Sequence, residues 1–473
     1  MILSIALAAA CGLGDARPNI VFAIADDWGW PHASAYGDEA IATPAFDAVA
    51  ESGVLFEHAY VSSPSCTPSR GAIITGQHFF RLGAGANLWC HWPVAEFAEY
   101  PTMLADAGYH VGSWRKAWGP GKSAGDVPPG GPRFKNVDAF FEARPDDAPF
   151  CLWFGASDPH RGYDLGSGAR AGIDPDTVHL FPHFPDVSEI RSDIADYGFE
   201  VQRFDRDVGR LIERLRASGE LASTLFVITG DHGMPFPRCK GNVYDSGTRV
   251  PLAVAWPERF PAGRTVTDFV SLTDLAPTFL EAAGVPVPAE MTGRSLLATL
   301  QSERSGRVEA HRDHVVFGRE RHVPCQDAPE CEGYPVRAIR TDYFLLVQNR
   351  RPDRWPAGTP DHEGCVTPGS WLGDCDNGPT KLWMWEHRDE EGVRSLYDLS
   401  FAKRPPVELF DLRIDPNQLR NVAEDPGYRE VRERLAQRLG TALERAADPR
   451  STGEAAVLEG HEYLGGGGGR WPY

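Results

Sequence analysis

The chain has 473 residues, of which 42% are hydrophobic and 24% are charged, and its 66 Asp and Glu outnumber its 47 Lys and Arg to give a net charge of −19. This length and composition are typical of a folded globular protein and exclude a wholly disordered chain. The acidic balance also excludes general binding to nucleic acid, because affinity for a duplex depends on Lys and Arg that neutralise phosphates. An anionic substrate would therefore need a local basic pocket.

The N-terminal segment 1–16, MILSIALAAACGLGDA, is an apolar run that ends in small residues. It resembles the later part of a secretory signal, although the usual basic residues do not precede it. Ala9, Ala10 and Cys11 also resemble a lipoprotein cleavage site, which would place a lipid on Cys11. We expect an exported protein, periplasmic or secreted, with either a cleaved signal or a lipid anchor; the alternative is a disordered or buried N-terminus. No apolar run reaches the ~18 residues that a transmembrane helix needs.

Four apolar runs predict buried parallel strands, at residues 19–25, 109–114, 150–156 and 225–229. Amphipathic helices are predicted between them, and the clearest covers residues 192–217. Its apolar residues recur at helical spacing: Val201, Phe204, Val208, Leu211, Ile212 and Leu215. A shorter helix is expected at 44–52. Alternation of strands and helices predicts a doubly wound α/β sheet.

Polar side chains follow each of the four predicted strands. They are Asp26 and Asp27, Arg115 and Lys116, Asp158 and His160, and Asp231 and His232. Because the carboxyl ends of parallel strands meet at one edge of a sheet, where ligands bind, we expect these side chains to lie together. The sequence thus predicts one functional site that contains carboxylates, imidazoles and a lysine.

From about residue 311 the pattern changes to shorter strands, at 336–340, 343–347 and 407–412, followed by a helix over 427–446. This pattern predicts a smaller α+β subdomain. The expected organisation is a signal-like segment over 1–16, a main α/β domain over 17–310, the subdomain over 311–450 and an irregular tail over 451–473.

Nine cysteines are spread unevenly along the chain. Cys325 with Cys331, and Cys365 with Cys375, form close pairs in Gly- and Pro-rich segments, which favours disulfides in an oxidising compartment. Cys90, Cys151 and Cys239 have no near neighbour. Cys151 lies inside an apolar run and is predicted to be a buried thiol. The spacing of a structural zinc site is absent.

The most specific motif is Cys66-Thr67-Pro68-Ser69-Arg70. Cys-x-Pro-x-Arg is the sequence at which sulfatases have a cysteine converted to formylglycine. Further matches lie along the chain: Asp26-Asp27, Thr43-Pro44, Thr75-Gly76, Asp411-Leu412 and Asp415-Pro416. From about residue 18 to 450 the chain resembles the formylglycine-dependent type I sulfatases, so the resemblance implies an alkaline-phosphatase-like fold with 17–310 as the catalytic domain.

The resemblance also implies the reaction and its metal. Hydrated formylglycine is a geminal diol, so one hydroxyl can attack sulfur and the other can later expel the sulfate. The implied metal ligands are Asp26, Asp27, Asp231 and His232, together with the residue made from Cys66. Many sulfatases have Asn where this chain has His232. We expect Ca²⁺, with Mg²⁺ and Mn²⁺ open because imidazole is a softer ligand than an amide oxygen.

Other catalytic roles come from the same resemblance. Arg70 would orient the diol, and Lys116 would bridge the formylglycine and the sulfate. His160 and Lys240 would bind the sulfate and protonate the leaving group. Trp118 stands where many sulfatases have a histidine two residues after the lysine. The expected partners are a sulfated carbohydrate and a formylglycine-generating or sulfatase-maturating enzyme.

Segments 157–161 and 233–237, with Asn242 and Tyr244, resemble the heparan N-sulfatase (sulfamidase) branch. We therefore expect an exo-acting sulfatase that prefers an N-sulfoglucosamine. Two alternatives stay open: a phosphonate or phosphate ester hydrolase that uses the same machinery, and a catalytically silent carbohydrate-binding relative. Trp89 and Trp92 are either sugar-stacking or packing residues.

Overall fold

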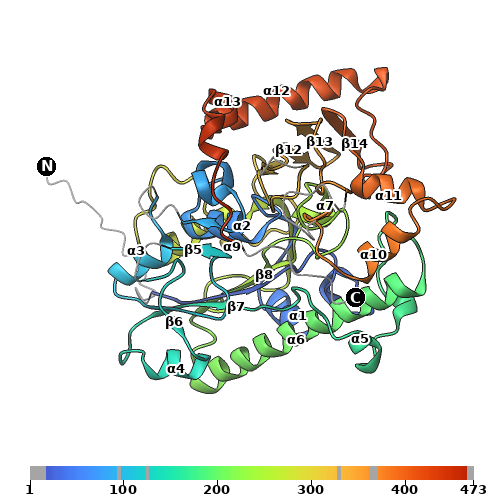
Figure 1. Ribbon diagram of the computed structural model, residues 1–473. Coiled ribbons are helices and arrows are strands. Elements are labelled where there is room, and N and C mark those ends of the chain that lie inside the picture. Colours follow the sequence, from blue (N-terminus) through green and yellow to red (C-terminus); the bar gives the residue numbers. More distant parts are fainter. Residues whose placement is uncertain (1–16, 93–96, 124–126, 328–331, 362–370, 466–473) are drawn as a thin grey trace, which may run out of the picture.

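The computed structural model describes residues 17–92, 97–123, 127–327, 332–361 and 371–465. The signal-like segment with Cys11, two of the paired cysteines (Cys331 and Cys365) and the end of the tail lie outside these residues. The described residues form two large sheets and a small two-stranded one made of β3 (Cys90–His91) and β5 (Gly121–Lys122) (Figure 1). Among the described residues, no helix combines the length and apolar character that crossing a membrane requires.

The larger sheet has eight strands in the order β10-β2-β9-β8-β1-β7-β4-β6. Its strands are β1 (Asn19–Ala25), β2 (Val54–Tyr60), β4 (His110–Trp114), β6 (Arg133–Phe134), β7 (Phe150–Gly155), β8 (Thr224–Gly230), β9 (Leu252–Ala255) and β10 (Arg264–Ser271). The four strands predicted from apolar runs are β8, β1, β7 and β4, and they lie side by side and parallel. Only β9 runs antiparallel to its neighbours β2 and β8.

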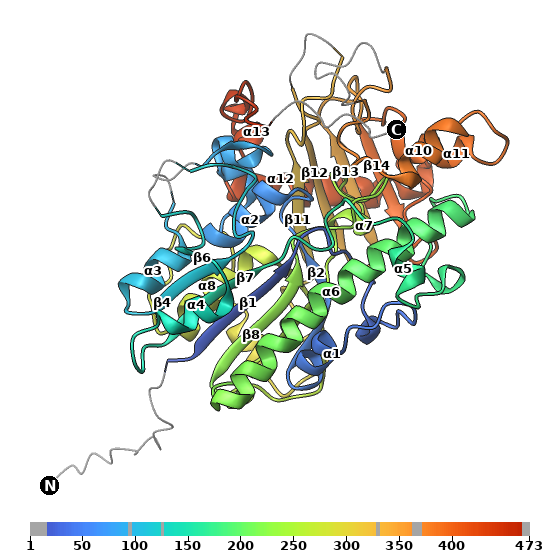
Figure 2. The same ribbon diagram turned by 60° about the horizontal axis from the view of Figure 1, so that its bottom comes forward.

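Helices cover both faces of this sheet, as expected for a doubly wound fold (Figure 2). Alternate residues of β1 point to opposite sides: Val21 packs with α1 (Pro44–Glu51) and α6 (Ser188–Ser218). Phe22 packs on the other side with α2, α3 and α8. The bounds of these and the remaining helices of this region are α2 (Cys66–Thr75), α3 (Tyr100–Asp106), α4 (Val137–Glu142), α5 (Ser167–Arg170), α7 (Asp245–Thr248), α8 (Leu275–Ala282) and α9 (Leu297–Gln301). Burial on both faces explains why β1 is a continuous apolar run.

The second sheet is antiparallel and has the order β11-β12-β13-β14. Its strands are β11 (His314–Arg319), β12 (Val336–Thr341), β13 (Phe344–Asn349) and β14 (Val407–Asp411), and its helices are α10 (Pro379–Glu386), α11 (Arg394–Phe401) and α12 (Arg429–Arg445). α12 packs Leu435, Leu439 and Leu443 against this sheet. The sequence patterns did not identify β11. The domain boundaries at residues 310 and 450 remain predictions.

The tail predicted to be irregular over 451–473 contains short helical segments in its first part, and its bounds stay a prediction. Residues Pro449–Thr452 form α13, and Ala455–Leu458 form a 3₁₀ helix. Leu458 is buried in the core beneath α12, and the backbone N–H of Leu464 donates to the carbonyl of Trp89. These contacts with distant segments hold residues 449–464 in place, and sequence periodicity does not predict such contacts.

Cys151 is a buried thiol on β7, as predicted. Cys325 and Cys375 are also free buried thiols. Their predicted disulfide partners, Cys331 and Cys365, lie outside the described residues, so both pairings stay predictions. Cys325 Sγ donates to Asp374 Oδ1 at 3.3 Å, and burial holds the pKa of this thiol well above its ordinary value.

Candidate active site

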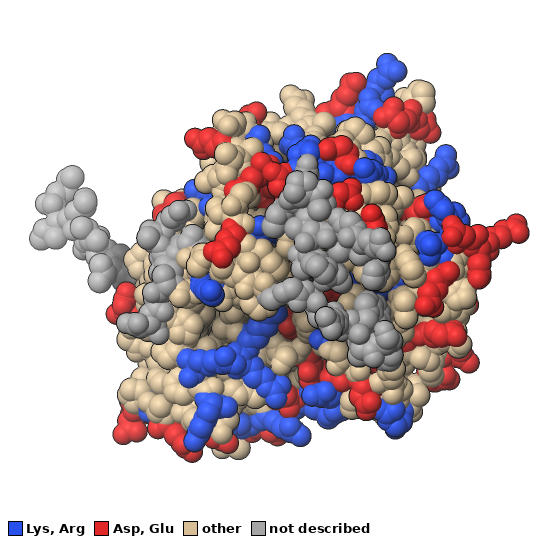
Figure 3. Space-filling view, in the orientation of Figure 1, with Lys and Arg blue, Asp and Glu red and all other residues tan. Residues whose placement is uncertain are grey.

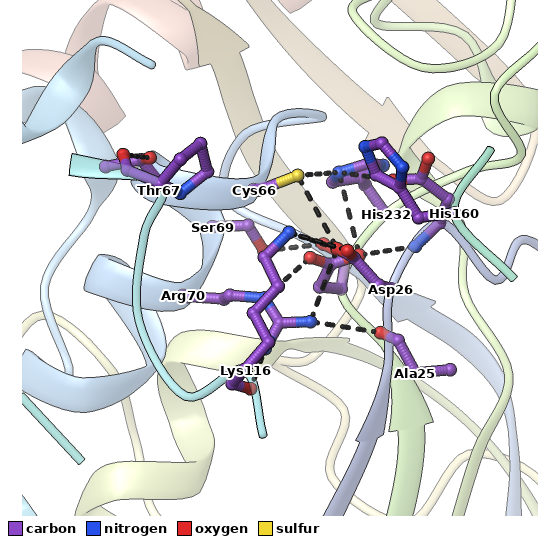
Figure 4. A network of polar contacts seen from close by, with 12 residues as sticks. Ala25, Asp26, Cys66, Thr67, Ser69, Arg70, Lys116, His160 and His232 are labelled. Carbon is purple, nitrogen blue, oxygen red and sulfur yellow. Dashed lines mark hydrogen bonds and ion pairs between the residues drawn. The ribbon is translucent and has the colours of Figure 1, made fainter. Parts of the chain in front are cut away.

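The carboxyl ends of β1, β4, β7 and β8 meet the N-terminus of α2 at one place. Figure 4 shows Asp26, Lys116, His160 and His232 around Cys66, the first residue of α2. The convergence of strand ends predicted from sequence is therefore present. Its physical origin is the parallel register of β8, β1, β7 and β4, which aligns the residues that follow each strand.

Cys66 is the side chain that faces the other groups. Its Sγ lies 3.2 Å from His232 Nε2 and 3.6 Å from Asp26 Oδ1, and only 2% of the residue is exposed. Burial raises the pKa of the Cys66 thiol well above its ordinary value. Such a thiol carries little thiolate at neutral pH and is a poor nucleophile. The site therefore does not favour ordinary cysteine chemistry.

Arg70 ties α2 to two strand ends. Its Nε donates to Asp231 Oδ2 at 2.7 Å, and its Nη1 donates to the carbonyl of Lys116 at 2.7 Å. Its Nη2 also lies 3.5 Å from Asp26 Oδ1. Because Arg70 is fully buried and bonded on three sides, it fixes the position of the carboxylates relative to Cys66.

A group of acceptor atoms has the composition of a metal site. Asp26, Asp27, Cys66 and His232 each offer one ligand atom, and these atoms lie within 4.8 Å of one another. His232 Nδ1 lies 3.1 Å from the carbonyl of Gly233, which can only accept, so Nδ1 carries the proton and Nε2 presents a lone pair. Nε2 is 3.3 Å from Asp27 Oδ1, a buried oxygen that accepts no hydrogen bond. An unpartnered carboxylate oxygen that faces this nitrogen fits a bound cation.

Asp231 lies at the edge of this group. One of its oxygens accepts from Arg70, and the other accepts from the backbone N–H of Asp27 at 2.8 Å and lies 3.6 Å from His232 Nε2. The backbone of Asp27 has φ 73°, a conformation that non-glycine residues rarely adopt. The bond to Asp231 therefore helps to hold the Asp27 carboxylate in the cluster.

Two lysines complete the charge pattern. Lys116 Nζ donates to both oxygens of Asp26, at 2.5 and 2.7 Å. Lys240 Nζ donates to Asp27 Oδ2 and to Asp376 Oδ2, each at 2.8 Å. Burial alone would raise the pKa of Asp26, but Lys116 and Arg70 hold it well below its ordinary value. Asp26 is therefore charged at neutral pH.

The balance of charge around Cys66 explains why a cation is needed. Four carboxylates (Asp26, Asp27, Asp231 and Asp376) face three cationic side chains (Arg70, Lys116 and Lys240). This leaves an excess of one negative charge, which opposes an anionic substrate. A divalent cation would reverse the sign. The side chains alone do not form the basic pocket that the sequence led us to expect.

A cavity of about 720 Å³ opens onto Cys66. It is lined by residues from several segments: Asp26, Cys66, Leu88, Trp89, Lys116, Trp118, Gly119, Pro120, Ser157, Asp158, His160, Arg161, Gly162, Lys240, His322, Val323 and Asp376. Trp118, which replaces a histidine common in sulfatases, packs its ring against Trp92 at 5.0 Å. Trp89 lines the cavity, whereas Trp92 is buried as a packing residue.

Sequence patterns did not single out two cavity residues from the C-terminal half. His322 Nδ1 lies 2.8 Å from Ser65 Oγ, so it contacts the turn that carries Cys66. Burial lowers the pKa of His322 to about 3, and the ring is therefore neutral. The other residue is Asp376, the partner of Lys240. Both lie in irregular segments, where no periodicity or motif marks a functional residue.

Arg161 lines the cavity, but its charge is already paired. Its Nη1 and Nη2 donate to the two oxygens of Asp193 on α6, each at 2.7 Å. Asp193 also accepts from the backbone N–H and the hydroxyl of Thr380 at the start of α10, at 3.2 and 2.6 Å. One buried carboxylate thus joins the cavity wall, α6 and α10.

Replacing Asp193 with Ala is expected to destabilise the protein by about 3–5 kcal/mol, because the buried guanidinium of Arg161 would lose its charge partner. Chemical denaturation measures this loss. Asp186→Ala is the matched control, since Asp186 pairs with Arg191 at the surface and its loss should change stability little. Equal stability of the two variants would contradict the structural role of Asp193.

Comparisons with known proteins agree with this geometry. The model of the sulfatase family matches residues 18–128 and 132–285, and the chain therefore belongs to the sulfatase family. A second model, described as the C-terminal part of N-sulphoglucosamine sulphohydrolase, matches residues 230–354. Human N-sulphoglucosamine sulphohydrolase is 31% identical, over 96% of this chain and 95% of that protein. An ulvan-active sulfatase of Formosa agariphila is 26% identical, over 89% of this chain and 78% of that protein.

Solved structures share the fold. One is BT4656 in complex with its substrate D-glucosamine-2-N,6-O-disulfate, with a TM-score of 0.65, 19% identity, and coverage of 92% of this chain and 99% of that one. Another is the phosphonate monoester hydrolase of Agrobacterium radiobacter, with a TM-score of 0.64, 18% identity, and coverage of 91% and 96%. The predicted alkaline-phosphatase-like α/β fold is confirmed.

Proposed function

We propose that the protein removes the N-linked sulfate from a terminal glucosamine of a sulfated saccharide. The main support for this proposal is the position of Cys66, the cysteine of a Cys-x-Pro-x-Arg motif. Cys66 belongs to the group of side chains that could bind a metal, lies between two lysines and lines the cavity. The similarity to human N-sulphoglucosamine sulphohydrolase along nearly the whole chain supports the choice of an N-sulfate.

The chemistry requires Cys66 to be converted to formylglycine by a maturating enzyme. Formylglycine supplies a hydrated aldehyde whose hydroxyl is a better nucleophile than a buried thiol. The high pKa of the Cys66 thiol supports this reading, because an unmodified cysteine would be unreactive here.

The residues around Cys66 suit the transfer of a sulfuryl group. Lys116 reaches Asp26 beside Cys66 and is placed to bind a sulfate oxygen. His160 and Lys240 lie at the cavity and can bind the sulfate or donate a proton to the departing nitrogen. Arg70 holds Asp231 and Asp26 in place. Asp26, Asp27, Asp231 and His232 would hold the cation, which we propose is Ca²⁺ because most of the donors are hard oxygens.

The distribution of charge supports action at a chain end. On the face shown in Figure 3, Lys and Arg gather below the centre and are interspersed with Asp and Glu. Three arginines of α6 are paired with carboxylates: Arg203 with Asp158, Arg210 with Asp207 and Arg214 with Asp138. An extended polyanion would need an unpaired basic stripe, whereas one terminal sulfate needs only the site itself. We also propose that the protein is exported.

The proposal predicts the order of activity on a small panel of substrates. The matured enzyme should hydrolyse N-sulfoglucosamine with a higher kcat/KM than glucosamine 6-sulfate or 4-nitrophenyl sulfate at matched concentrations. A higher kcat/KM for either O-sulfate would refute the preference for nitrogen and leave the sulfatase assignment in place. Including a phosphonate monoester tests the rival activity, and turnover of that compound alone would replace the proposal.

A further inference from the structure

Among the described residues of the C-terminal half, the carboxylate that lines the cavity is that of Asp376, which stands between β13 and α10 in sequence. Its side chain is 22% exposed. The segment that carries it is firmly held: Lys381 Nζ donates to the carbonyls of Trp371 and Cys375, at 3.0 and 2.9 Å, and to Asn377 Oδ1 at 2.9 Å. Asp376 therefore reaches the cavity from a fixed backbone.

The neighbouring carboxylate, that of Asp374, has a different role. Its Oδ2 accepts from Arg319 at 2.9 Å, and its Oδ1 accepts from the backbone N–H of Val323 at 2.9 Å. These contacts hold the segment against the second sheet. Asp374 is 1% exposed and does not line the cavity. Of these two neighbouring carboxylates, Asp376 is thus the one that can meet a substrate.

Asp376 lies beside His160 and Lys240, which in the proposed function donate a proton to the nitrogen that leaves sulfur. Its Oδ2 accepts from Lys240 at 2.8 Å. Asp376, His160 and Asp27 each present a nitrogen or oxygen within 4.8 Å of the other two. If His160 and Lys240 act on the departing nitrogen, the Asp376 carboxylate is close to that nitrogen.

A carboxylate is an unusual neighbour for an anionic substrate, since it repels sulfate oxygens. It is useful only where the substrate offers a hydrogen-bond donor or a positive charge. An N-sulfate has an N–H at the atom that links sulfur to the sugar, and its product is an amine that becomes an ammonium ion. An O-sulfate has at the same place an oxygen with lone pairs only.

We propose that Asp376 accepts a hydrogen bond from the nitrogen of an N-sulfated sugar and thereby selects N-sulfate over O-sulfate. This inference rests on the proposed function. Lys240 and His160 cannot provide that selection by donation, because a proton donor serves a departing nitrogen and a departing oxygen alike. A charged carboxylate bonded to Lys240 keeps acceptor sites for a second donor. Sites built around one substrate N–H or O–H discriminate strongly against analogues that lack it.

The competing explanation is that Asp376 only positions Lys240. The two roles differ in their effect on substrates. Loss of a positioning contact would weaken hydrolysis of N- and O-sulfates together, whereas loss of the acceptor would weaken hydrolysis of N-sulfates alone. The ratio of the two kcat/KM values therefore separates them.

The test compares matured wild type with Asp376→Ala and Asp376→Asn, on N-sulfoglucosamine and on the better of the two O-sulfates. The N-to-O ratio should fall about 10- to 100-fold in Asp376→Ala, the effect of losing a hydrogen bond to a charged group. It should fall less in Asp376→Asn, which keeps a neutral acceptor. Asp389→Ala, which removes an exposed carboxylate beside Arg394, should leave the ratio unchanged.

A second readout does not depend on N-sulfate turnover. Glucosamine should inhibit hydrolysis of the O-sulfate, and its inhibition constant should rise about tenfold in Asp376→Ala, while the inhibition constant of free sulfate should not. An unchanged N-to-O ratio, or an equal loss on both substrates, would overturn the role of Asp376 and leave the proposed function standing. If the wild type hydrolyses none of the sulfates, the proposed function itself is wrong.

Discussion

Replacing Cys66 with Ala is expected to abolish turnover and leave the fold intact. Formylglycine cannot form without the cysteine, so the loss of kcat should be at least about 10³-fold, as for other covalent nucleophiles. Stability should change little, because the substitution removes one sulfur atom from the start of α2 and leaves Arg70 and Asp231 paired. Steady-state kinetics and thermal unfolding of the same preparation measure both effects.

Cys151→Ala is the matched control for this experiment. It also removes a buried thiol, but from β7 in the core, away from the cavity. This variant should be matured and remain active. Substantial activity in Cys66→Ala with wild-type stability would refute the formylglycine mechanism. Mass spectrometry of peptides containing residue 66 from native-host protein should show the conversion directly, and an unmodified Cys66 would favour the silent carbohydrate-binding alternative.

Removal of the metal is expected to lower activity and melting temperature together. The cation would lie among carboxylates that repel one another, so its binding should stabilise the folded state. At a free metal concentration of about 1,000 times Kd, the linked stabilisation is about 4 kcal/mol. Lys116 and Lys240 contact Asp26 and Asp27 and offset part of the repulsion, so the protein should remain folded after metal removal.

The measurement is exhaustive chelation, verified by elemental analysis, followed by assay and thermal unfolding. Restoring Ca²⁺, Mg²⁺ or Mn²⁺ separately identifies the ion, and Ca²⁺ should restore both properties at the lowest concentration. If verified removal changed neither activity nor melting temperature, the assignment of Asp26, Asp27 and His232 as ligands would be wrong.

Two properties of the site bear on how it works: the high pKa of the Cys66 thiol and the excess negative charge of the side chains around it. In the proposed function, Cys66 acts only after it is converted to formylglycine, and the cavity takes an anion only after a cation binds. The proposal thus makes maturation and metal binding separate requirements for activity, and the Cys66 and chelation experiments test them independently.

The sequence by itself determined four adjacent strands of the main sheet and most of the site residues that follow them. β1, β4, β7 and β8 are buried on both faces, so each appears as a continuous apolar run. The residues that follow them meet because parallel strands are in register, which places Asp26, Lys116, His160 and His232 together. The motif around Cys66 is local, and it was readable without a structure.

Only the tertiary structure decided how those charges are paired and what else reaches the cavity. Asp376 and His322 come from irregular segments that the second sheet brings to the site, and Arg161 is neutralised by Asp193 from α6. The order of residues 449–458 likewise depends on packing beneath α12. Periodicity and motifs in the sequence predict the local conformation and burial of one segment. They do not predict which distant segment contacts it, because that contact forms only when the elements pack together.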